Sequence, residues 1–106
     1  CLESPQEIQD RLRRRYLDRL AQRVKKLRKL LIERNWEALR TECHQLSIGG
    51  ENFGFHSLTH LAHRVYETIP EGKLSRSMNF PQTKERTEEL IAAIDVILID
   101  YAVIRA

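Results

Sequence analysis

Apolar side chains recur at steps of three and four residues along most of this chain, the spacing that gathers them on one face of an α-helix. Four such stretches are separated by a corner at 34–35, a glycine pair at 49–50 and a Pro-Glu-Gly run at 70–72. With only 4 Gly and 3 Pro in 106 residues, little else can interrupt a helix. Because short corners favour antiparallel neighbours, we expect an all-α fold, an up-down antiparallel four-helix bundle. A break near Arg15 would add a short N-terminal helix.

The ends of the four helices are predicted from capping and breaking residues. Ser4-Pro5 can cap and open the first helix, which we expect to run to about Glu33. Asn35 can cap the second helix, where the glycine pair either ends the helix or lets the backbone pack closely. The third helix is expected over residues 53–69, and the fourth from about residue 82 to the end of the chain.

Each expected helix has an apolar face that we assign to the core. Residues 71–81 are expected to form a loop, in which Leu74, Met78 and Phe80 can tuck against the bundle. The residues assigned to the helical core are Leu12, Tyr16, Leu17, Leu20, Val24, Leu27, Leu30, Leu31, Trp36, Leu39, Cys43, Leu46, Phe55, Leu58, Leu61, Ala62, Val65, Ile69, Leu90, Ile91, Ile94, Ile97, Leu98, Tyr101 and Ile104.

The length of the chain allows one compact domain with a single core, so we treat residues 1–106 as one domain. Because the sequence begins at Cys1 without a methionine, we interpret it as a piece cut from a longer protein. No apolar run approaches the roughly 20 residues of a membrane span, and we expect no membrane contact. Cys43 falls on the core face of its helix, which favours a buried thiol in a reducing compartment. We therefore expect a cytoplasmic protein.

Positive charge is concentrated in the first third of the chain. Residues 1–34 hold 11 Lys and Arg against 5 Asp and Glu, whereas residues 35–106 hold 7 against 10. The basic part could meet an acidic protein, a phosphate or a nucleic acid. A long helix packed on one side also needs charged residues on the other, so we interpret the run as a solvated face and expect no nucleic-acid partner. The leucine stripe of the same helix leaves a dimer open.

A histidine motif is the chemically most informative part of the chain. Residues 43–55 place His44 late in the second helix, followed by the glycine pair and by Phe-Gly-Phe. At about 100° per residue, His44 lies to one side of the apolar stripe, where it can face solvent and a docking partner. Elsewhere we find no nucleotide-binding loop, complete metal-ligand set or nucleophile–base–carboxylate arrangement.

Over residues 10–105 the chain resembles the histidine-containing phosphotransfer (HPt) family. The corner 34–39 resembles the family's turn into the histidine helix. The resemblance implies that His44 accepts a phosphoryl group and exchanges it with an aspartate of a receiver domain in bacterial two-component signalling. It also implies a response-regulator receiver domain and/or a histidine kinase as partners, no cofactor or metal in this domain, Mg²⁺ supplied by the receiver, and no turnover of its own. The matching residues are His44, Leu46, Gly49, Gly50, Phe53, Gly54, Phe55, Leu58, Leu61 and Ala62.

The chain departs from the family pattern beside His44. The family's lysine or small residue three positions later is Ser47, and its glycine four positions later is Ile48, which can shield His44. His63 lies where chemotaxis kinases carry a histidine that orients the phosphoacceptor, but their following glutamate is here Tyr66. The resemblance thus implies His44 as phosphoacceptor and Ser47 and His63 as residues that orient the phosphate. Partner docking is expected at Gln45, Ile48 and Gly49.

Other functions stay open at this point. The two departures motivate a pseudo-HPt domain that cannot be phosphorylated and acts as a binding or dimerisation scaffold. His56 and His60 are spaced to bind Zn²⁺, and His63 and Glu67 share their stripe, although a solvated face is our preferred interpretation. A basic helical module that binds nucleic acid is the weaker remaining hypothesis.

Overall fold

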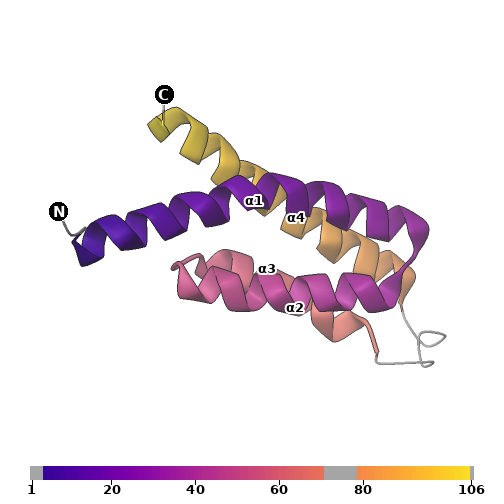
Figure 1. Ribbon diagram of the computed structural model, residues 1–106. Helices are drawn as coiled ribbons and strands as arrows, with labels where there is room; N and C mark the ends of the chain where they lie inside the picture. The colour runs from indigo at the N-terminus through magenta and orange to yellow at the C-terminus, as the bar shows by residue number, and fades with distance from the viewer. Residues whose placement is uncertain (1–3, 71–78, 106) are drawn as a thin grey trace.

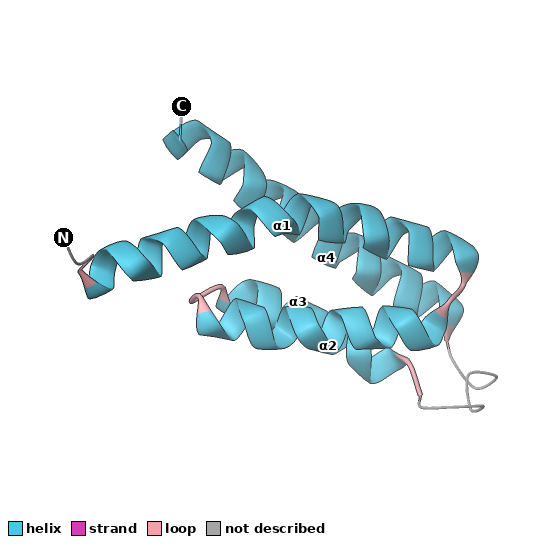
Figure 2. Cartoon of the chain, viewed as in Figure 1, coloured by secondary structure: helices cyan, strands magenta, loops and turns pink. Residues whose placement is uncertain are grey.

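A computed structural model describes residues 4–70 and 79–105, with side chains described up to residue 102. These residues form four helices: α1 (Pro5–Glu33), α2 (Trp36–Asn52), α3 (His56–Thr68) and α4 (Phe80–Arg105). Within these two ranges every regular element is a helix (Figure 2). Successive helices alternate in direction, and α1 and α3 each pack against both α2 and α4 (Figure 1). The predicted all-α up-down bundle is confirmed.

The helix ends show the expected capping chemistry. The Ser4 hydroxyl accepts a hydrogen bond from the backbone N–H of Glu7 at 3.1 Å, and the Asn35 side chain accepts one from Ala38 at 3.3 Å. Arg34 adopts the left-handed conformation, φ 56°, that lets its N–H reach the last carbonyls of α1. Because α1 runs without interruption for 29 residues, no separate short N-terminal helix is found within it.

The glycine pair does not end α2. The helix continues through it to Asn52, and α3 therefore begins at His56 rather than near residue 53. A Cβ added to Gly50 would lie 2.7 Å from Thr59 Oγ1 and 3.1 Å from the carbonyl oxygen of Phe55. Close backbone packing is thus the role of this glycine, the second of the two expected alternatives. The turn itself is made at Gly54, whose φ of 81° favours glycine.

Most of the expected core is buried, but the outer parts of α1 and α4 extend past it. Figure 1 shows both helices projecting beyond the turn between α2 and α3. Leu12, which lies on the apolar face of α1 and was expected inside, is 41% exposed. Phe80 belongs to α4 rather than to a loop, and its ring meets that of Trp36 at 5.5 Å. Leu74 and Met78 lie outside the described residues. The buried core consists of Leu17, Leu20, Val24, Leu27, Leu30, Leu39, Cys43, Leu46, Leu58, Ala62, Val65, Ile69, Leu90, Ile91 and Ile94.

One carboxylate is buried between α1 and α2. Glu42 is only 4% exposed, and its two oxygens lie 2.7 Å from Arg23 Nη1 and 3.2 Å from Lys26 Nζ. A buried charge is tolerated when it is paired in this way.

Among the described helices, none is both long and apolar enough to cross a bilayer.

We expect Glu42→Gln to lower the free energy of unfolding by about 1–3 kcal/mol, since it removes a charge that two cations hold at the helix interface. Urea denaturation followed by circular dichroism measures this loss. Glu51→Gln, at an exposed position on the same helix, is the matched control and should change stability by less than about 0.5 kcal/mol. Equal effects of the two substitutions would contradict a stabilising role for the ion pairs.

Candidate functional site

His44 is presented by the middle of α2, on the side away from the core. Its neighbour Cys43 is fully buried, whereas the imidazole is exposed. The helix continues for eight residues beyond His44, so its backbone is held on both sides. The side chain therefore reaches solvent from within a continuous helix rather than from a loop.

Tyr66 and Arg40 lie close to His44 and contact each other. The Tyr66 ring, on α3, lies 5.3 Å from the imidazole, with 31° between the ring planes. Arg40, one helical turn before His44, donates from Nη2 to the Tyr66 hydroxyl at 2.7 Å. The guanidinium carbon also lies 4.3 Å from the centre of the Tyr66 ring, within the range of a cation–π interaction. One aromatic ring thus contacts both the arginine and the histidine.

His63 reaches this cluster only through Tyr66. Its ring stacks on Tyr66 with centroids 5.9 Å apart, and its Nε2 lies 3.0 Å from Glu67 Oε1. The side-chain neighbours of His63 are therefore a tyrosine and a carboxylate on its own helix. His56 and His60 are exposed along α3, and no group of three potential metal ligands is found in the part of the chain that the structure describes.

The thiol of Cys43, the residue before His44, is unreactive near neutral pH. Burial, with a smaller contribution from the charge of Glu42, raises the pKa of Cys43 from 9.0 to about 12. Since the thiolate is the reactive form, Cys43 is not a nucleophile near neutral pH.

We expect iodoacetamide to modify Cys43 at least about 100-fold more slowly in the native protein than in urea between pH 7 and 9. Mass spectrometry of the peptide containing Cys43 measures the rate. Because the folded-state pKa is raised, the protonated thiol contributes stability below about pH 9, and this contribution decreases as the pH rises from 9.0 toward about 12. Rapid native labelling at pH 7 would contradict the burial.

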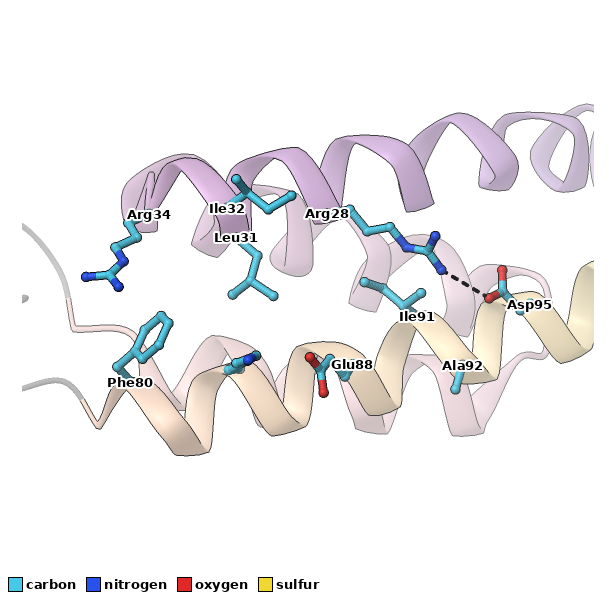
Figure 3. A pocket seen from close by; sticks show the side chains of 10 residues that line it. Arg28, Leu31, Ile32, Arg34, Phe80, Glu88, Ile91, Ala92 and Asp95 are labelled. Carbon is cyan, nitrogen blue, oxygen red and sulfur yellow. Dashed lines mark ion pairs between the residues drawn. The ribbon is translucent and has the colours of Figure 1, made fainter.

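A separate groove lies between α1 and α4. Its volume is about 610 Å³, and Leu31 and Ile91 point into it from the two helices (Figure 3). Arg28 and Asp95 approach to 3.5 Å at one end, while Arg34 lies over the Phe80 ring at the other. This groove shares no residue with the cluster around His44, which lies on α2 and α3.

The comparison with protein-family models matches the Hpt domain over residues 11–98. The chain belongs to the Hpt domain family. Searches against curated proteins and against solved structures returned no match. The matched range includes His44 and every residue that contacts it above, so the cluster lies within the part of the chain that defines the Hpt domain.

The docking residues predicted for the Hpt domain differ in exposure. Ile48 is 52% exposed one turn beyond His44, and Gln45 is exposed at the edge of a hollow of about 260 Å³ between α1 and α2. Gly49 is half-buried, because the Tyr16 ring packs over it. Ser47 is also half-buried, and its carbonyl oxygen accepts a hydrogen bond from Thr59 Oγ1 at 2.9 Å. The roles assigned to these residues remain predictions.

Sequence reasoning did not identify Arg40 and Tyr66 as members of the site. Two signals were present: Arg40 precedes His44 by four residues, and Tyr66 follows His63 by three, so each shares a helical face with a candidate histidine. Only the packing of α3 against α2 places the tyrosine between the two histidines and beside the arginine.

Proposed function

We propose that this Hpt domain is a phosphorelay module that carries a phosphoryl group on His44 and exchanges it with the aspartate of a receiver domain. The observation that supports the proposal is the exposed imidazole of His44 on α2, within the range 11–98 that matches the Hpt domain. A response-regulator receiver domain and/or a histidine kinase would be the partners, in a bacterial two-component system.

Imidazole chemistry suits this exchange. A neutral imidazole has one nitrogen lone pair available for attack. That lone pair forms the N–P bond while the P–O bond of the aspartyl phosphate breaks, and the released electron pair returns to the aspartate carboxylate. The proton on the other ring nitrogen stays on the ring or passes to water. We expect Mg²⁺ to be supplied by the receiver, where it would neutralise charge on the phosphoryl oxygens.

Incubation with a panel of phosphorylated receiver domains tests the proposal. We expect acid-labile phosphate on the protein, mapped to His44 by mass spectrometry under mildly alkaline conditions. Binding of each receiver is measured in parallel by calorimetry. Failure of every receiver and kinase to label the protein, while one receiver still binds, would overturn the relay and favour a pseudo-Hpt scaffold.

The exposed Ile48 is the observation that favours this second function. Its β-branched side chain is exposed one turn from His44, where it would narrow the approach of a receiver. A domain that binds a receiver without accepting phosphate would tolerate this bulk, whereas a relay would transfer more slowly because of it.

We expect Ile48→Gly to increase the rate of phosphotransfer to His44 by about threefold to tenfold, equivalent to about 0.7–1.4 kcal/mol in the barrier. The substitution should also lower stability by about 0.5–1 kcal/mol through helix propensity. Ile48→Ala is the matched control, since it removes the bulk and keeps a good helix former. Rapid-quench transfer from one phosphorylated receiver measures both variants, and an unchanged or slower rate in both would show that Ile48 does not obstruct the site.

A further inference from the structure

We propose that the outer face of α1 and α4 binds a second copy of this chain, so that the protein forms a symmetric dimer. The outer face is the side of these two helices that points away from α2 and α3, which lie behind them in Figure 3. It comprises the groove between α1 and α4, which Ile32 and Ala92 help to line, and the exposed side chains of Val96 and Ile99. The dimer does not depend on phosphotransfer by His44.

The C-terminal half of α4 carries apolar side chains on more than its core-facing side. Only two residues of the run 91–104 are charged. Val96 and Ile99 are 58% and 63% exposed, and they follow Ala92 by four and seven residues, so the three side chains share one stripe. A helix that is apolar on all sides is typically buried on all sides. This second stripe therefore indicates that another apolar surface covers the outer side of α4.

The end of α1 extends the same apolar surface. Ile32 is 80% exposed, more than any other large apolar side chain among the described residues. Leu31, next to it, points into the groove toward Ile91 of α4 (Figure 3). The leucine stripe on the inner side of α1 is not available for a second chain, because Leu20 and Leu27 are fully buried in the core of their own copy. A dimer would accordingly form through the outer face.

The charges of the two helices favour a second copy as the occupant. Helix α1 carries 10 Lys and Arg against 4 Asp and Glu, whereas α4 carries 3 against 5. A two-fold axis running along the helices, between the two outer faces, places α1 of each copy over α4 of the other. The basic helix then meets the acidic helix twice. Such complementarity belongs to whole faces, so an ion pair within one copy, such as Arg28 with Asp95 at 3.5 Å, does not remove it.

The proposed dimer leaves His44 accessible in both copies. The imidazole is exposed on α2 and contacts Tyr66 of α3. Helices α2 and α3 lie on the other side of the bundle from the outer face (Figure 1). Each copy can therefore meet a partner through α2 and α3 while it is paired through α1 and α4.

Sedimentation velocity of the wild-type chain over a range of concentrations tests the dimer. We expect the mass to rise from that of one chain to that of two, with half of the chains paired between about 1 and 100 μM, as for a small interface. Val96→Glu and Ile32→Glu should each weaken the association at least about tenfold, because each buries a charge between the copies. Ile48→Glu, at an exposed isoleucine of α2, is the matched control and should pair like the wild type. Circular dichroism confirms that each variant is folded.

Charge reversal tests the pairing of α1 with α4. One double variant carries Lys25→Glu and Lys29→Glu on α1, and the other carries Glu85→Lys and Glu88→Lys on α4, all at exposed positions. Each double variant alone should pair more weakly than the wild type at low ionic strength. An equimolar mixture should form a mixed dimer, because each copy then offers the charge that the other needs.

A wild-type chain that remains monomeric at about 200 μM, well above the expected dissociation constants, would overturn the inference. So would a dimer that survives Val96→Glu and Ile32→Glu in the same chain, because its interface would lie elsewhere. A dimer that is lost in Leu12→Glu alone would place the interface at the projecting helix ends. Reversed variants that pair no better when mixed would overturn the arrangement of α1 over α4.

Discussion

His44→Gln is expected to lose all acid-labile phosphate that receivers transfer to the wild type, while its affinity for those receivers changes by less than about threefold. The expected loss is complete because the other imidazole near the site, that of His63, contacts Tyr66 and Glu67 on α3 and does not take the place of His44 on α2. Glutamine keeps a polar side chain of similar reach and a good helix former at this exposed position. Stability should fall by no more than about 1 kcal/mol, the order of one aromatic contact with Tyr66.

His56→Gln and His60→Gln are the matched controls, since both histidines are exposed on α3 and neither contacts His44. These variants should keep wild-type labelling. Label that persists in His44→Gln and disappears in one of the controls would move the phosphoacceptor to α3. A His44→Gln protein that no longer binds any receiver would contradict the view that docking depends on the surrounding surface more than on the imidazole itself.

Gly50→Ala is expected to lower the free energy of unfolding by about 2 kcal/mol, although alanine is the better helix former by about 1 kcal/mol. The added Cβ would stand 2.7 Å from Thr59 Oγ1 and 3.2 Å from the backbone nitrogen of Thr59, so α3 would have to move away from α2. Overpacking of this kind costs about 1–3 kcal/mol. Chemical denaturation measures the loss, and the Tyr66–His44 contact should loosen with it.

Gly49→Ala separates crowding from helix propensity. Its new Cβ would meet the edge of the Tyr16 ring at 2.9 Å, a side chain that can shift, rather than backbone. We therefore expect a smaller loss than at Gly50, or a small gain. Gly50→Ala as stable as the wild type would mean that α2 and α3 can separate at no cost, which is inconsistent with the close contact at Thr59.

The helices could be predicted from the sequence because their signals are local. Ser4, Asn35 and the three- and four-residue apolar steps act within a turn or two of themselves. The end of α2 was predicted less well, since a glycine pair is compatible with a helix end or with close packing, and only the approach of Thr59 decides between them. The assignment of Leu12 to the core was wrong, because periodicity identifies the apolar face of a helix but not whether another helix covers it.

The candidate site could likewise be predicted only in part from local sequence signals. His44 could be selected from its motif and placed outside the apolar stripe of α2 by counting residues. Its contact with Tyr66, and that of Tyr66 with Arg40, joins residues more than 20 positions apart and depends on how α3 is rotated against α2. Such a rotation is decided by the whole interface between two helices, which no single motif encodes.

The cluster around His44 is carried by a helical hairpin, α2 and α3, whose connection spans only residues 53–55. Its contacts described above therefore lie within one hairpin, residues 36–68, whereas the projecting ends of α1 and α4 belong to opposite ends of the chain (Figure 1). Local opening of a protein begins where buried contacts are few. Amide hydrogen exchange should accordingly be fast over the first turns of α1 and the last turns of α4 and slow around His44. Motion at these two helix ends can then proceed without disturbing the geometry around His44.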